Sequence, residues 1–312
     1  MTWWRSSASS TSPTRTDTSL LRCTVVAVTM VVTVSLAAPA AFSSAPAHAG
    51  GAEILWANNG ARTIGSADID GTYVDQGFIE TGAFNPCGLA VYDGKIYWAE
   101  EESNRIGRAN LNGSGVRSSF IDTGLASDPC GVAVYAGKIY WASGQNGSTI
   151  GRANLNGTDV DDRFITGVDN AFGVAVSAHY IYWGYVRITG RATTVGRARI
   201  SGTDVDPQFI RGADNACALA VYSGHLYWAN CGDDISHGSI GRSLLNGTDV
   251  DQQFIPGTPG ASGLAFYGGH LYWSENSSSD SSIGRADVNG SHADLHFIVG
   301  ANDPFGVAVS SG

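Results

Sequence analysis

The sequence has few charged residues and few histidines, and it shows little sign of helix. Asp, Glu, Lys and Arg make up 15% of the 312 residues, with seven histidines and five cysteines. Beyond one apolar run near the N-terminus, no window repeats apolar residues at helical spacing. The sequence contains neither a G-x-S-x-G elbow nor a phosphate-cradling loop. These absences exclude a helical fold, a hydrolase of the serine-elbow class and a histidine-rich zinc site.

The N-terminal segment has the order of a secretory signal peptide. Three arginines precede the apolar run Val25–Leu36, and Ala47-His48-Ala49 matches an A-x-A cleavage site. The run is shorter than the roughly 20 apolar residues that a membrane-spanning helix needs. We therefore expect residues 1–49 to be a signal peptide and residues 50–312 to be a secreted domain without a membrane span.

The formal net charge of −10 bears on possible partners. An acidic surface disfavours nucleic acid and anionic membranes, and it permits cations or basic partners. Acidity is also ordinary for a soluble secreted protein, so it does not by itself define a site. We expect a monomer with no nucleic-acid partner and no cofactor, and we leave a divalent cation such as calcium open.

One unit of the sequence returns six times. The stretch Lys95–Ile121 holds a Tyr-Trp strand, an Ile-Gly-Arg strand, an Asn-Gly turn and a strand that ends in Phe-Ile. Its tryptophan recurs every 42 to 45 residues, as Trp56, Trp98, Trp141, Trp183, Trp228 and Trp273. A fixed period in this range is typical of solenoids and propellers.

Each unit is preceded by a short apolar strand such as Cys130–Tyr135, whose small and branched residues suit a strand buried on both faces. A two-residue turn then leads into the Tyr-Trp strand, which predicts a hairpin. Glycine recurs in every third strand, as in Ile150-Gly151-Arg152. Because glycine weakens a strand, we expect a bulky ring to lie over each of these glycines.

The two ends of the repeat region complement each other. The region begins with a second strand, Glu53–Ala57, and ends with a first strand, Phe305–Ser310. Pairing these two strands closes the ring and removes its open edges. The sequence therefore predicts an all-β, six-bladed β-propeller with four antiparallel strands per blade, closed by a C-terminal strand that joins the N-terminal blade.

The residues resemble a known family at this point. Tyr97-Trp98 followed by Arg105-Ile106-Gly107-Arg108 is similar to the YWTD repeat, the class B repeat of low-density lipoprotein receptors. The resemblance covers all six repeats and implies a six-bladed propeller. The Thr and Asp of YWTD are replaced, by Ala99 and Glu100 in this unit, and the receptors' trailing cysteine-rich module is absent. The Ile-Gly-Arg strands also resemble repeats of virginiamycin B lyase-like propellers, an enzyme family with seven blades.

We expect candidate binding residues on the face where the chain enters the first strands and leaves the second strands. Recurring Asn and Asp residues on this face are interpreted as turn residues. Residues that depart from the repeat are better candidates for ligand binding. The candidates are Glu100, Glu101, Glu102, Asp128, Tyr185, Arg187, Asp233, Asp234, His237 and Asp303.

Histidines and cysteines limit the possible chemistry. Only His237 is expected on the candidate face, so a lyase with paired histidines lacks its parts. Cys217 is expected opposite Asn230, which predicts a Cys217–Cys231 disulfide. Cys87 and Cys130 occupy the same position in neighbouring blades, and the spacing of the blades decides whether a disulfide can form. A bridge between them therefore competes with two free buried thiols.

Two functions from different classes remain open. The first is a secreted, non-catalytic propeller that presents a loop face to a protein or carbohydrate ligand. The second is a propeller enzyme, a lyase or lactone hydrolase, with its site at the mouth of the axial channel. A divalent ion held by Asp128, Asp303 or Glu100 would favour the enzyme, and the missing histidine pair favours binding.

Overall fold

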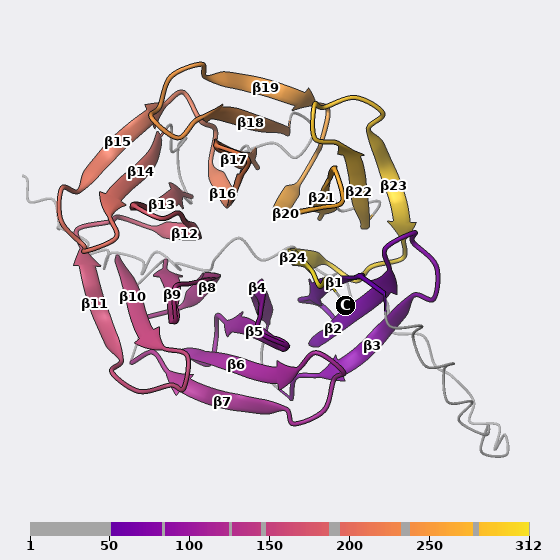
Figure 1. The fold of residues 1–312 in the computed structure, drawn as a ribbon. Helices are drawn as coiled ribbons and strands as arrows, with labels where there is room; N and C mark the ends of the chain where they lie inside the picture. The colour runs from indigo at the N-terminus through magenta and orange to yellow at the C-terminus, as the bar shows by residue number, and fades with distance from the viewer. Residues whose placement is uncertain are drawn as a thin grey trace, which may run out of the picture. The chain divides into compact units, whose positions relative to one another are not determined.

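The computed structural model describes residues 51–82, 85–124, 127–144, 148–186, 194–231, 238–276 and 281–311. These residues contain 24 strands and no helix, and therefore no helix that could cross a membrane. The strands form six sheets of four, arranged as blades around an axis (Figure 1). The predicted all-β, six-bladed propeller is confirmed.

Each blade takes four strands from consecutive sequence, except the first. Blade 1 has the strand order β24-β1-β2-β3, and blades 2 to 6 begin at β4, β8, β12, β16 and β20. The strands are β1 (Glu53–Asn58), β2 (Thr63–Asp68), β3 (Asp75–Glu80), β4 (Pro86–Tyr92), β5 (Lys95–Glu100), β6 (Arg105–Asn110), β7 (Arg117–Asp122), β8 (Pro129–Tyr135), β9 (Lys138–Ser143), β10 (Thr149–Asn154), β11 (Asp161–Thr166), β12 (Ala171–Val176), β13 (Tyr180–Tyr185), β14 (Thr194–Arg199), β15 (Asp206–Arg211), β16 (Ala216–Tyr222), β17 (His225–Asn230), β18 (Ser239–Leu244), β19 (Asp251–Pro256), β20 (Ala261–Tyr267), β21 (His270–Glu275), β22 (Ser282–Asp287), β23 (Asp294–Val299) and β24 (Pro304–Val309).

The ring is closed by the C-terminal strand. β24 pairs antiparallel with β1, with Ile54 opposite Val309 and Trp56 opposite Val307. β24 also contacts the innermost strands of both neighbouring blades, β20 and β4. The predicted closure is confirmed, and the C-terminus lies beside blade 1 (Figure 1).

Glycine lets the innermost strands approach each other closely around the axis. A Cβ atom on Gly131 would lie 2.5 Å from the carbonyl oxygen of Phe172, and one on Gly173 would lie 2.5 Å from that of Cys217. No real side-chain atom tolerates such a distance, so these positions admit only glycine. The short apolar strands can therefore lie innermost, since their glycines let neighbouring strands approach closely.

The glycine of each third strand lies under the tryptophan of its own blade. Gly151 pairs with Trp141 across β10 and β9, and a Cβ atom on Gly151 would lie 2.1 Å from the indole ring. The corresponding Cβ distances in the other five blades are 2.1 to 2.4 Å. All six indoles are fully buried. The expectation that a ring covers these glycines is confirmed.

We expect Gly151→Val to destabilise the protein by about 3 kcal/mol, at the upper end of the range for an overpacked core. The branched side chain would displace the Trp141 ring, which has no free space to enter. Chemical denaturation would measure the loss. Gly77→Val is the matched control, because a Cβ atom there meets nothing closer than 3.8 Å. Equal stability of the Gly151→Val variant and the parent would contradict the packing described here.

Acidic residues that recur in the outer strands have a structural use. Asp161, Asp206 and Asp251 each begin a fourth strand, and each Oδ1 accepts the backbone N–H two residues later. Asp75 and Asp294 do the same. These bonds support the register shift that every outer strand makes at this point. Part of the net negative charge therefore stabilises turns and bulges.

Candidate functional site

The propeller has two ends with different connections. We call the loop face the end that carries the second-to-third-strand and blade-to-blade connections, such as residues 101–104 and 167–170. We call the hairpin face the opposite end, which carries turns such as residues 93–94 and 111–116. The sequence candidates were all expected on the loop face.

The recurring Asn and Asp residues of the loop face are turn residues, as interpreted. Asn85, Asp128, Asn170, Asn215 and Asp303 all have positive φ, between 41° and 52°. Asn and Asp adopt this left-handed conformation more readily than other residues with a side chain. Each carbonyl oxygen also accepts the backbone N–H that follows the second strand of the same blade, as Asn85 does from Glu101 at 3.4 Å.

Glu100 lies in the interior and binds the tryptophan of its blade. Its Oε1 accepts the indole N–H of Trp98 at 2.8 Å, and its Oε2 accepts the hydroxyl of Ser103 at 2.6 Å. The carboxyl is fully buried, and this burial raises its pKa. Glu275 makes the same bond to Trp273, and Asn58 makes it to Trp56. In blades 1, 2 and 6 the residue two positions after the tryptophan thus accepts the indole N–H, a role that sequence reasoning missed.

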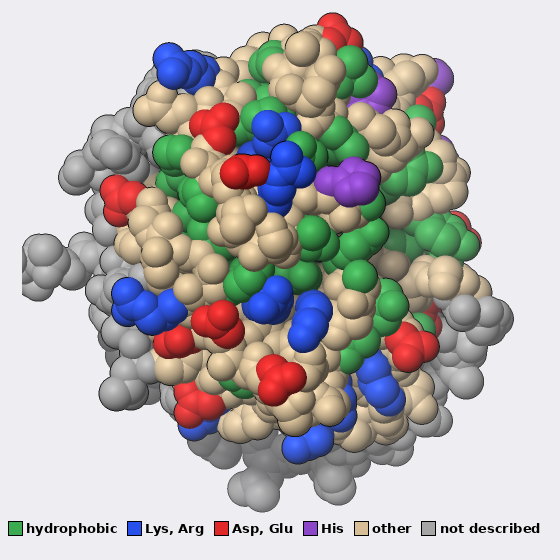
Figure 2. All heavy atoms as spheres, turned by 60° about the vertical axis from the view of Figure 1, so that its left-hand side comes forward, with side chains coloured by type: hydrophobic (Ala, Val, Ile, Leu, Met, Phe, Trp, Pro, Cys, Tyr) green, Lys and Arg blue, Asp and Glu red, His purple; other side chains and the backbone are tan. Residues whose placement is uncertain are grey.

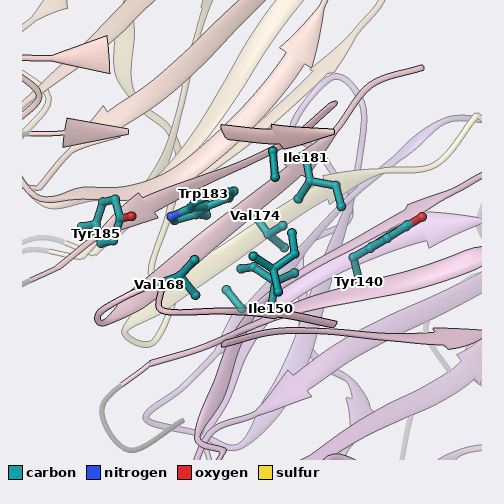
Figure 3. Close-up of a cluster of buried hydrophobic side chains, with 11 residues drawn as sticks. Tyr140, Ile150, Val168, Val174, Ile181, Trp183 and Tyr185 are labelled. Carbon is teal, nitrogen blue, oxygen red and sulfur yellow. The ribbon is translucent and has the colours of Figure 1, made fainter. Parts of the chain in front are cut away.

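Tyr185 occupies this same position in blade 4 and also lies in the core. Its side chain is 8% exposed and belongs to a buried cluster with Trp183, Val174 and Ile150 (Figure 3). The Tyr185 and Trp183 rings meet edge to face, with centroids 6.4 Å apart. Burial raises the pKa of the Tyr185 hydroxyl. Its aromatic ring therefore stabilises the junction of blades 3 and 4.

Blade 3 lacks a residue that caps its tryptophan. Ser143 stands where Asn58 stands in blade 1, and neither Trp141 Nε1 nor Ser143 Oγ finds a hydrogen-bond partner although both are buried. In blade 1, Asn58 Nδ2 also donates to Thr63 Oγ1 at 3.2 Å. In blade 3, Thr149 stands where Thr63 stands in blade 1, and its hydroxyl donates to the backbone carbonyl of Asp162 in the outer strand β11.

We expect Ser143→Asn to stabilise the protein by about 1 kcal/mol, because the new amide would satisfy the Trp141 indole as Asn58 satisfies Trp56. Chemical denaturation would measure the gain. Ser143→Ala is the control and should change little, since the hydroxyl makes no bond to lose. A loss of stability in Ser143→Asn would show that blade 3 does not share the geometry of blade 1.

Three of the candidate carboxylates gather where blades 2 and 3 meet. Glu101 follows β5, Asp128 precedes β8, and Glu102 accepts a hydrogen bond from Asn85 Nδ2 at 2.8 Å. Burial, with the nearby charges of Asp128 and Glu102, raises the pKa of Glu101 to about 7. Glu102 is exposed, and Asp128 is half-buried. Glu101, Glu102 and Asp128 therefore form an acidic group on the loop face, which we call the acidic corner.

We expect Glu101→Gln to be more stable than the parent at pH 8, by about 1–2 kcal/mol once solvent screening of this partly exposed group is allowed for. Above pH 7 the folded protein holds an ionised Glu101 beside two other carboxylates. As the pH falls through 7 towards 4.5, the folded state takes up the proton first and the penalty disappears. The advantage of Gln should therefore shrink over this window. Denaturation at pH 8 and at pH 4.5 would test this, with Glu102→Gln as the exposed control.

Asp303 lies apart from the acidic corner, in another blade. Asp303 is exposed in blade 1, and its carbonyl accepts the Asn59 N–H at 3.1 Å. Arg187, Asp233, Asp234 and His237 lie outside the described residues. No described group of three or more His, Cys, Asp or Glu side chains converges as a metal site.

Both expected disulfides are present. Cys217 and Cys231 are bonded with Cα atoms 6.0 Å apart, and Cys87 and Cys130 with Cα atoms 5.0 Å apart. One detail of the prediction was wrong, because a register shift between Ala216 and Ala218 places Ala216, instead of Cys217, opposite Asn230. The bridge between Cys87 and Cys130, which the sequence left open against two free thiols, is formed, and the blade spacing at this point is within disulfide reach. Gly88 allows this approach, since a Cβ atom there would lie 2.3 Å from the carbonyl oxygen of Cys130.

The axial channel is nearly filled by side chains. It is lined by residues of all six innermost strands, including both members of the Cys87–Cys130 disulfide, and its cavity volume is ≈ 50 Å³. The Phe172 and Phe305 rings, from blades 4 and 1, meet with centroids 6.5 Å apart. A cavity of this size holds a few water molecules, whereas small-molecule sites run to about 300–1,000 Å³.

The flank of the propeller over blades 3 and 4 shows no region of one charge. Acidic and basic side chains are interspersed there, with hydrophobic side chains between them (Figure 2). Arginines of the third strands lie over phenylalanines of the fourth, as Arg152 does over Phe164 at 3.7 Å from the ring centroid. These arginines are used for packing, which leaves the acidic corner as the clearest charged group among the described residues.

Solved structures share the fold. A crystal structure of a nidogen/laminin complex matches with a TM-score of 0.62 and 19% identity, covering 83% of this chain and 98% of that one. A virginiamycin B lyase from Staphylococcus aureus matches with a TM-score of 0.53 and 16% identity, covering 81% and 84% of the two chains. A streptogramin B lyase matches with a TM-score of 0.52 and 18% identity, covering 71% and 72%. No family model and no curated protein matches this chain. At these identities the likeness shows the fold alone.

Proposed function

We propose that this protein is a secreted, non-catalytic propeller that binds a protein ligand through the acidic corner of its loop face. The observation that carries the proposal is the near-filled axial channel, where a propeller enzyme would hold its substrate. Among the described residues of the loop face, the acidic corner gathers three carboxylates, and it suits a partner with basic side chains. The two disulfides support an oxidising compartment.

The structural neighbours support two readings of the same fold. A chain of this fold was solved in a nidogen/laminin complex, which supports a protein ligand. The virginiamycin B lyase and the streptogramin B lyase support the alternative, a propeller enzyme of the lyase class. The described histidines weigh against a lyase with a histidine pair on the loop face. His179, His225, His270 and His292 lie at the hairpin face, and His296 lies in the outer strand β23.

A charge-matched pair of variants tests the proposal. The first, Glu101→Gln/Glu102→Gln/Asp128→Asn, removes three negative charges from the loop face. The second, Asp159→Asn/Asp204→Asn/Asp249→Asn, removes three from the hairpin face and retains residue types that tolerate positive φ. Each protein would be immobilised and exposed to the secreted proteins of its own source.

The proposal expects a protein that the parent and the hairpin-face variant retain and the loop-face variant loses. Equal retention by all three proteins would refute the acidic corner as the binding site. Incubation of the parent with streptogramin B, followed by chromatography and tandem mass spectrometry of the product, tests the alternative. Conversion of streptogramin B to a new product would establish the lyase and overturn a purely binding role.

A further inference from the structure

One corner of the hairpin face recurs in every blade. It brings together the first residue of the second strand, the last residue of the third strand and a residue of the turn that follows. In blade 3, Lys138 Nζ donates to Asn154 Oδ1, and Asn154 Nδ2 donates to Asp159 Oδ2 at 2.6 Å. In blade 2, Lys95 Nζ donates to Asn110 Oδ1 at 2.5 Å. A lysine holds this corner in both blades.

Blade 6 holds the same corner with two imidazoles. His292 Nδ1 lies 2.7 Å from Asp287 Oδ2, and His270 Nδ1 lies 3.2 Å from Asp287 Oδ1. Ser291 Oγ also donates to Asp287 Oδ2, at 3.1 Å. One carboxylate is therefore bracketed by two groups that gain charge between pH 8 and pH 5, the range in which histidine titrates.

We propose that His270, Asp287 and His292 form a proton-controlled clasp on the turn between β22 and β23. When the imidazoles are neutral, each contact is an ordinary hydrogen bond or a weak polar contact. Proton uptake turns both contacts into charge-assisted pairs with one carboxylate. Because the closed corner then binds protons more tightly than the open one, the turn tightens as the pH falls.

Asp287 is suited to remain the anion of this clasp. The hydrogen bonds from His292 and Ser291 hold the pKa of its carboxyl below its ordinary value, and the charges of both histidines act in the same direction. Asp287 therefore stays ionised throughout the range in which the imidazoles titrate. The clasp opens again only in acid strong enough to protonate this carboxylate.

The other ionisable groups on the packed strands do not compete in this pH range. Tyr267 stands opposite His270 in β20, and the Tyr272 and His270 rings meet edge to face with centroids 6.3 Å apart. Burial raises the pKa of the Tyr272 hydroxyl, away from this pH range. Arg285 lies over the Phe297 ring, and Asp294 Oδ1 accepts the His296 N–H.

Blade 5 is an internal comparison. His225 stands where His270 stands in blade 6, but the carboxylate position is occupied by Leu244. His225 Nδ1 instead lies 3.1 Å from the carbonyl oxygen of Ser223, within its own hairpin turn. A histidine at this corner therefore reaches across to the third strand only where a carboxylate is there to meet it.

Hydrogen exchange on the full chain tests the clasp. The reporter is the Gly290 amide, which donates to the Asp287 carbonyl at 2.8 Å inside the turn. The internal reference is Gly157 in the lysine-held turn of blade 3, which donates to the Asn154 carbonyl at 2.9 Å. Protection factors, corrected for the intrinsic pH dependence of exchange, would be compared at about pH 5.5 and pH 8, on either side of the histidine range.

We expect the protection of Gly290 to fall about threefold from the lower to the higher pH, the scale of a surface ion pair, and that of Gly157 to stay constant. Asp287→Asn and His292→Asn should each reduce this difference, and His270→Lys should keep Gly290 protected at the higher pH. Asp287 ends β22 and His292 lies in the turn that follows, so testing both variants guards against a local folding defect in either one. Equal protection of Gly290 at both pH values, or an unchanged difference in Asp287→Asn, would overturn the clasp.

Discussion

Deletion of residues 302–312 is expected to abolish folding of the whole propeller. The deletion removes β24, whose Val307 packs in one buried cluster with Ile54, Trp56 and Ala265 of two blades. It also leaves β1 without the partner that satisfies its inner edge. The expected loss exceeds about 5 kcal/mol, the lower end of the total stability of a folded domain.

Circular dichroism and thermal melting of the truncated chain would measure this loss. Deletion of residues 311 and 312 alone is the control, because these residues follow β24 and should leave the melt unchanged. A peptide of residues 302–312 added to the truncated chain should restore part of the structure by strand addition. A truncated chain with the melting temperature of the parent would refute closure by β24.

The closure was predictable from the sequence because it follows from counting strands. A region that starts with a second strand and ends with a first strand has one solution that leaves no open edge. The glycines of the third strands were predictable for a similar reason. A residue that weakens a strand and yet recurs in every repeat must give space to a neighbour, and the six tryptophans were the neighbours large enough to need it.

The environments of Glu100 and Glu101 were harder to foresee. The two residues are adjacent and chemically alike, but Glu100 binds the Trp98 indole in the core and Glu101 belongs to the acidic corner. Strand alternation contained a signal, since residues two apart share a face and Glu100 is two positions from Trp98. The extent of the second strand decides between the two environments, and strand ends are the least predictable feature of a sequence.

The irregular register at Cys217 could not be read from the sequence at all. Each innermost strand of blades 2 to 6 carries an extra residue near its start, which displaces every pairing before that point by one position. Bulges of this kind bend a strand to meet its surroundings in three dimensions. In this protein they accompany the close approach of neighbouring blades at the axis, which depends on all six blades at once.

This close approach leads to the second large effect. Cys87→Ala/Cys130→Ala is expected to lower the free energy of unfolding by about 4 kcal/mol, and Cys217→Ala/Cys231→Ala by about 3 kcal/mol, from the chain-entropy model. The order follows from the lengths of chain enclosed, with sequence separations of 43 and 14 residues. The longer loop contains almost the whole of blade 2, so its bond restricts more of the unfolded chain.

Denaturation of both double variants, with non-reducing peptide mapping of the parent, would test this order. The Cys87–Cys130 bond also joins the strands that follow Asn85 and Asp128. Asn85 donates a hydrogen bond to Glu102, and Asp128 belongs to the acidic corner. Loss of the disulfide should therefore weaken the ligand binding that we propose for the loop face, even at temperatures where the propeller stays folded. A Cys130–Cys231 or Cys87–Cys217 linkage in the peptide map would contradict the blade order itself, because the bonded pairs lie in neighbouring blades or within one blade.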